Sequence, residues 1–163
     1  MGCHQLYFSA LKDLITITVP RDLRQTLPGT PEMVLELPIT PEGVTLGGYI
    51  DERIPHCVNH IKVGDFGELE VLLIACDDGD VLAYYTHQFL HEIQLLEDPK
   101  SYNHLLSTRI PFFHENVGSS SWGLALHEKS RLIAVSSNLR QITIFAHGYT
   151  AFADGEKKPA KGT

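Results

Sequence analysis

The densest group of side chains able to bind a metal ion lies in the segment His56-Cys57-Val58-Asn59-His60. Imidazole and thiolate groups both ligate zinc, and their spacing here is short. A closed zinc site needs about four ligands, however, and no second Cys/His pair follows at ligand spacing. We therefore expect His56, Cys57 and His60 to be ordinary loop or strand residues, and the sequence predicts no metal site.

Two further groups could bind ions but fit no known ligand pattern. His87 and His91 are four residues apart, yet the Glu of a zinc-protease motif does not stand between them, so we expect surface histidines. The run Asp77-Asp78-Gly79-Asp80 offers three carboxylates, but a calcium-binding EF-hand needs alternating ligands over twelve residues ending in Glu. A solvated hairpin turn is the expected role of this run.

The sequence contains no nucleophile or phosphate-binding motif. Residues 118–122 read Gly-Ser-Ser-Ser-Trp, and Trp122 replaces the last Gly of the hydrolase turn G-x-S-x-G. Residues 45–49 lack the spacing and the Lys of a phosphate loop. We predict no catalytic residue, no cofactor and no small-molecule substrate, so the protein is not expected to be an enzyme. Trp122 could anchor a partner protein, but its apolar neighbours favour packing in the core.

Composition narrows the class of protein further. The 163 residues are 43% hydrophobic and 20% charged, which is typical of a folded domain. The net charge of −7 argues against direct binding to nucleic acid. No apolar run reaches the roughly 20 residues of a membrane span, and the first residues lack the pattern of a signal peptide. Three scattered cysteines do not suggest a disulfide framework, so a reducing compartment is expected.

Hairpins must position these residues. Residues 71–76 and 81–85 are apolar runs joined by a turn containing Asp78-Gly79, which favours a hairpin and should also accept Asn-Gly. A second hairpin is predicted over residues 131–146, in whose turn Asn138 is the residue best able to take a left-handed conformation. A weaker third hairpin covers residues 6–19. The inner strands are apolar almost throughout, so we expect each to be covered on both faces.

Further strands complete a repeated unit. Strands are expected over residues 60–63 and 122–126, ahead of the two better hairpins, and another over residues 33–37. Three strands in series with turn-rich spacers are typical of a propeller blade. The predicted fold is therefore all-β, a partial WD-repeat-like β-propeller of about three blades.

The same pattern divides the chain. The partial propeller should span residues 1–148, with long loops at 28–48 and 99–118, followed by a disordered polar tail at 149–163. Residues 87–96 fit either a short helix or an outer strand. Because closed propellers have typically four to eight blades, the chain reads as a piece of a larger ring.

Four segments in order resemble the fungal family of constitutive ribonucleotide-reductase transcription regulators. They are residues 54–64 (IPHCVNHIKVG), 70–85 (EVLLIACDDGDVLAYY), 111–118 (PFFHENVG) and 122–138 (WGLALHEKSRLIAVSSN). The resemblance covers about residues 6–148. Members of this family are much longer, and the pattern stops at Gly148.

The resemblance implies a WD-repeat-like scaffold that negatively regulates ribonucleotide-reductase genes and serves as an adaptor of a cullin-type ubiquitin ligase. Its partners would be other proteins, including cullin ligase subunits, and its location the nucleus, with the cytoplasm left open. No catalytic residue is carried over from the family. Two alternatives remain: a propeller enzyme with a His/Asp site at the central channel, formed if His56, His60 and Asp77 converge, and a non-functional truncated remnant.

Overall fold

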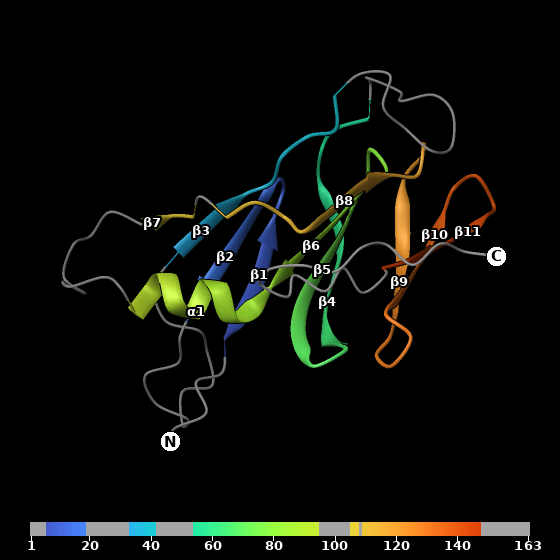
Figure 1. The fold of residues 1–163 in the computed structure, drawn as a ribbon. Helices are drawn as coiled ribbons and strands as arrows, with labels where there is room; N and C mark the ends of the chain where they lie inside the picture. Colours follow the sequence, from blue (N-terminus) through green and yellow to red (C-terminus); the bar gives the residue numbers. More distant parts are fainter. Residues whose placement is uncertain (1–5, 19–32, 42–53, 95–104, 108, 148–163) are drawn as a thin grey trace.

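The computed structural model describes residues 6–18, 33–41, 54–94, 105–107 and 109–147 (Figure 1). These residues form three sheets that lie side by side. Sheet A has the strand order β1 (Tyr7–Leu11), β2 (Leu14–Thr18), β3 (Met33–Glu36), β7 (Leu105–Leu106). Sheet B has the order β4 (Val58–Phe66), β5 (Leu69–Cys76), β6 (Asp80–Tyr85), β8 (Phe113–Asn116). Sheet C has the order β11 (Ile142–Ala146), β10 (Leu132–Ser137), β9 (Ser121–His127).

The pairings confirm the predicted all-β class and all three hairpins. β1 with β2, β5 with β6, and β10 with β11 are antiparallel neighbours, and only the short β3–β7 pair among the described strands is parallel. The leading strands β4 and β9 pair with β5 and β10 as expected. Strand β9 also lies against β4 of the neighbouring sheet. This arrangement of neighbouring sheets is consistent with a partial propeller.

Two turns show where local sequence did and did not determine the backbone. Gly79 has φ +93°, as the predicted Asp-Gly turn requires. In the turn between β10 and β11, however, the left-handed residue is Arg140 (φ +59°) and not Asn138, so that prediction was wrong. Asn138 is held in place by two contacts, because its N–H donates to the Ser120 carbonyl and its side chain accepts the Trp122 indole N–H.

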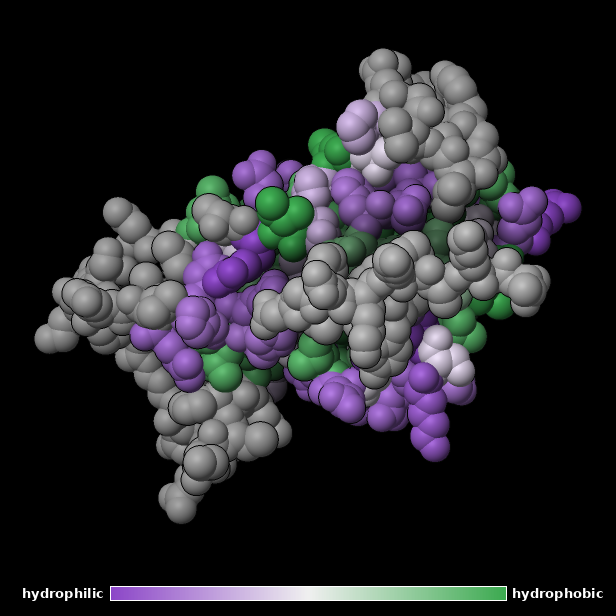
Figure 2. Space-filling model, in the orientation of Figure 1, coloured by the Kyte–Doolittle hydropathy of each residue, from purple (hydrophilic) through white to green (hydrophobic). Residues whose placement is uncertain are grey.

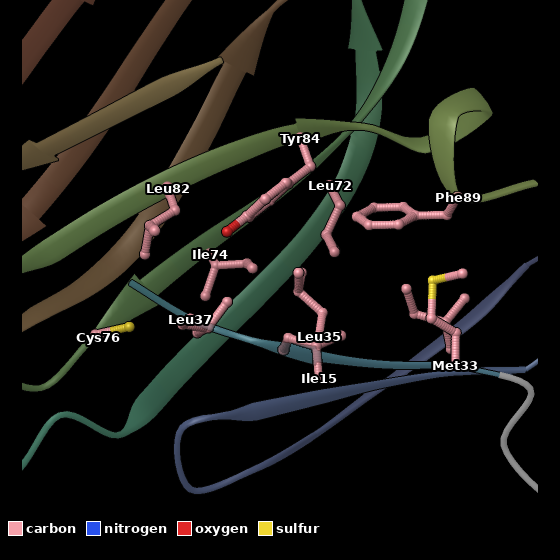
Figure 3. Packing of buried hydrophobic residues seen from close by; sticks show 11 residues of the cluster. Ile15, Met33, Leu35, Leu37, Leu72, Ile74, Cys76, Leu82, Tyr84 and Phe89 are labelled. Carbon is pink, nitrogen blue, oxygen red and sulfur yellow. The ribbon is translucent and has the colours of Figure 1, made fainter. Parts of the chain in front are cut away.

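Sheet B forms the middle layer and is covered on both faces, which confirms the expectation from its continuous apolar strands. Leu72, Ile74 and Cys76 of β5 point toward sheet A, where they pack with residues of β2 and β3 (Figure 3). The alternate residues of β5 point the other way and pack against sheet C. This alternation is the period of two that a β-strand imposes.

The structure settles the segment whose form the sequence left open. Helix α1 (Thr86–Gln94) occupies most of residues 87–96, and its Phe89 is fully buried between sheets A and B. Among the described residues, no helix has the length and apolar character needed to cross a membrane.

Of the two predicted loops, the second contains more structure than expected. Strand β3 confirms the strand predicted near residues 33–37 within the first loop. The segment 99–118 was expected to be irregular, yet it contributes β7 to sheet A and β8 to sheet B. The sequence of β8, Phe-His-Glu-Asn, lacks an apolar alternation, so pairing with β6 and not propensity determines it. The tail at 149–163 lies outside the described residues.

Candidate functional site: a buried histidine and aspartate network

A network of polar side chains surrounds the turn between β5 and β6. Asp78 and Asp80 of this turn are buried, although the sequence suggested a solvated turn. Their partners come from distant parts of the chain: His56 ahead of β4, Thr40 after β3, and His114 of β8. The prediction of a solvated turn was wrong because charged residues are mostly exposed unless they are paired. The partners that pair these carboxylates are distant in the sequence, so the pairing could not be foreseen.

His56 and Asp78 form the closest pair. His56 Nδ1 lies 2.6 Å from Asp78 Oδ2 and 3.7 Å from Asp80 Oδ2, and the side chains of His56 and Asp78 are each 8% exposed. Burial alone would lower the pKa of His56. The hydrogen bond to Asp78 and the negative charges of Asp78, Asp80 and Asp13 outweigh it, so the pKa is raised above the ordinary 6.5. The pair therefore favours a charged imidazolium against a carboxylate.

Asp80 is fully buried and bonded at both oxygens. Its Oδ2 accepts the Thr40 backbone N–H at 2.8 Å and lies 3.2 Å from His114 Nε2, while its Oδ1 accepts the Asn116 side-chain N–H at 2.7 Å. Burial alone would raise the pKa of Asp80, but the hydrogen bonds from His114, Thr40 and Asn116 together lower it. The carboxylate is thus held in its ionised form.

The network continues into sheet C. Ser121 of β9 is fully buried, and its hydroxyl donates to the Cys76 carbonyl at 2.9 Å. Asn59 of β4 donates to Asp77 Oδ1 at 3.2 Å and to the Ser121 carbonyl at 3.1 Å. The turn between β5 and β6 therefore binds segments adjoining all three sheets.

The residues first considered as a metal site are not brought together. His56 joins the network, whereas His60 is exposed, and its Nδ1 contacts the Trp122 carbonyl at 2.8 Å. Among the described residues, one group of possible ligands does form, in which donor atoms of His56, Cys76 and Asp78 lie within 4.8 Å of one another. The sequence could not reveal this group because Cys76 and Asp78 belong to the next hairpin.

In this group, His56 and Asp78 form a hydrogen-bonded pair, and the thiol of Cys76 lies beside it. His56 and Asp78 bond each other directly, and burial together with the nearby carboxylates raises the pKa of Cys76 so that its thiol stays protonated. The Nε2 atom of His56 is buried and has no partner among the described residues. The expected absence of a metal site stays a prediction.

Of the remaining candidates that the structure describes, Asp77 joins the network through its bond to Asn59, and the others are exposed. His87 and His91 are exposed on α1, which confirms them as surface residues. Trp122 is 51% exposed, so the prediction that it packs in the core was wrong; a bulge in β9 leaves it outside the regular pairing. Asp77 bonds Asn59 and does not converge with His56 and His60. Residues 45–49 lie outside the described residues.

The surface of the described residues carries exposed apolar side chains and a hollow. Figure 2 shows hydrophobic patches scattered among polar side chains on one face of the molecule. A hollow of about 360 Å³ lies beside the end of β3 and contains no residue of the network. Its lining residues are Glu36, Leu37, Pro38, Leu106, Ser107, Arg109, Ile110 and Pro111.

One comparison with known proteins gives a match. The model of a family described as CRT10 matches residues 48–158, which include all of the described strands of sheets B and C. No curated protein and no solved structure matches the chain.

Proposed function

The chain belongs to the CRT10 family, and from this premise we propose that it is a non-enzymatic scaffold that regulates transcription of ribonucleotide-reductase genes through contacts with other proteins. The family match over residues 48–158 is the observation that carries the proposal. It agrees with the four sequence segments that resemble regulators of these genes.

The polar network supports a scaffold more than a catalyst. A catalytic acid, base or nucleophile must reach a substrate, usually at a concave site. Both oxygens of Asp80 are bonded within the protein, and Asp78 accepts hydrogen bonds from His56 and from the backbone N–H of Asp80. These groups hold strands together. Any binding of partner proteins would therefore fall to residues on the surface.

Transcript measurements test the proposal directly. Deleting the gene in its source organism should raise ribonucleotide-reductase transcripts if the protein is a negative regulator, and re-expressing the chain should restore them. A matched re-expression of His60→Ala, which changes an exposed residue outside the network, serves as a control for expression. Unchanged transcripts after deletion would contradict the proposal.

The finer parts of the proposal concern fold and partners. We propose that the three sheets are blades of a WD-repeat-like propeller and that the protein acts as an adaptor of a cullin-type ubiquitin ligase in the nucleus. Purification of the tagged protein from nuclear extract should recover cullin subunits. Recovery of the tagged protein without them, while transcripts still respond to deletion, would reject the adaptor role and leave the regulatory role intact.

A further inference from the structure

We propose that His56, Cys76 and Asp78 form a binding site for a zinc ion, in which His56 and Cys76 ligate the metal and Asp78 orients the imidazole ring. Donor atoms of these three side chains lie within 4.8 Å of one another. A bound ion would fasten the segment ahead of β4 to the end of β5. The proposal departs from the sequence-based expectation of no metal site, and it does not rest on the proposed function.

His56 has the geometry of a histidine that is prepared to ligate a metal. A zinc-bound imidazole usually donates its other ring N–H to a carboxylate, which fixes the orientation of the ring. His56 Nδ1 lies 2.6 Å from Asp78 Oδ2, and the same carboxylate accepts the backbone N–H of Asp80 at 3.3 Å. Because Nδ1 is engaged, Nε2 is the ring atom that remains to bind a metal.

The burial of Nε2 is an independent observation that points to a ligand. This atom is buried and has no hydrogen-bond partner among the described residues, and the side chain of His56 is only 8% exposed. Buried polar atoms without a partner are few in native structures. A metal at Nε2 would satisfy this nitrogen and leave the bond to Asp78 intact. Binding through Nδ1 would break that bond, because ligands on tetrahedral zinc lie roughly 3.3 Å apart, farther than the observed 2.6 Å.

Cys76 supplies the ligand that selects the metal. Its side chain is fully buried, and Figure 3 shows it at one end of the apolar cluster between sheets A and B. Thiolate together with imidazole suits zinc, whereas magnesium and calcium prefer oxygen ligands. Burial and nearby carboxylates raise the pKa of the Cys76 thiol, so zinc must displace the thiol proton, and any proton on His56 Nε2, into solvent.

Two protein ligands imply moderate affinity. Closed structural zinc sites have four protein ligands, so solvent would complete the coordination here. We therefore expect an ion that a chelator removes and that exchanges with zinc in solution. Because such an ion binds the folded chain, adding zinc should raise the Tm.

Cobalt(II) titration of the full chain after treatment with a chelator tests the site. Cobalt(II) substitutes for zinc, and its bond to a thiolate gives a charge-transfer absorption band in the near ultraviolet. The parent should develop this band up to one ion per chain, and zinc should then abolish it by displacing the cobalt. Cys76→Ser should show no band. Asp78→Asn should keep the band but bind about 10- to 100-fold more weakly, since the ring loses its carboxylate partner.

Cys57→Ser is the matched control, because Cys57 is a neighbouring free cysteine that is not part of the group of donor atoms. It should bind cobalt as the parent does. Circular dichroism verifies that each variant folds, and Cys76→Ala takes the place of Cys76→Ser if the latter does not. A parent without the band overturns the proposal. A band that persists in the folded Cys76 variant, a band that is lost in Cys57→Ser, or an unchanged affinity in Asp78→Asn also overturns it.

Discussion

Replacing His56 by Ala should destabilise the protein by removing the partner of a buried carboxylate. Breaking a buried ion pair from one side typically costs about 3–5 kcal/mol, because the remaining charge is left without compensation. Here Asp78 keeps the backbone N–H of Asp80, at 3.3 Å, and Asp80 keeps its other partners. We therefore expect a loss of about 3 kcal/mol. For a chain of this size that corresponds to a fall in Tm of roughly 10 °C.

The effect of His56→Ala should depend on pH in a defined direction. The pKa of His56 is raised in the folded state, so its contribution is complete below about pH 6.5 and is lost as pH rises through the folded pKa. The pKa of Asp80 is lowered, so its contribution is present above about pH 4 and is lost as pH falls through its folded pKa. The free-energy difference between parent and variant should therefore be largest near pH 6 and smaller at alkaline pH.

Urea denaturation followed by circular dichroism, repeated from pH 5.5 to 8.5, measures this difference. His60→Ala is the control, because His60 is exposed and lies outside the network, and we expect it to change stability by less than about 0.5 kcal/mol. A His56→Ala variant as stable as the parent at pH 6, or a difference that grows as pH rises, would refute this account of the pair.

Two other substitutions and one activity measurement give further tests. Gly79→Val should cost about 2–3 kcal/mol in urea denaturation, since Gly79 has φ +93° and a Cβ there would lie 2.8 Å from the Ser119 carbonyl oxygen; stability equal to that of the parent would show that the turn relaxes. Asn116→Ala should cost about 2 kcal/mol by leaving Asp80 Oδ1 and the Gly118 N–H unpaired, and a loss below about 0.5 kcal/mol would mean that water replaces the amide. Purified protein should hydrolyse neither generic esters nor nucleotides, and turnover abolished by His56→Ala in a folded variant would overturn the non-enzymatic proposal.

Much of the fold could be predicted because its determinants are local. The hairpin of β5 and β6 follows from two apolar runs and a turn in which Gly79 adopts positive φ at no steric cost. The middle position of sheet B follows from the same runs, since a strand that is apolar on both faces must be covered on both. Strand β8 could not be predicted, because its sequence has no strand pattern and only its pairing with β6 defines it.

The network escaped prediction for a different reason. Its bonds join residues far apart in the chain, such as Asp80 with His114 and Thr40 with Asp80. Spacing along a sequence carries information on such contacts only within one helix or hairpin. The sequence did offer one signal, the three carboxylates in a tight turn between two apolar strands. A solvated turn does not need so many charged residues. With Asp78 buried, the prediction that Asn-Gly would be accepted at this turn also loses its basis.

The buried polar residues and the exposed apolar residues of this protein suit different functions. The titratable groups at the centre of the network, His56, Asp78 and Asp80, are engaged with one another, with the Asn116 amide or with the backbone, and the unpartnered Nε2 of His56 is itself buried. Such groups fix the relative positions of strands but present nothing to a substrate. The surface, by contrast, exposes Trp122, Ile142 and Ile144, residue types able to form contacts with another protein. A polar junction inside and apolar contact residues outside agree with the binding scaffold that we propose.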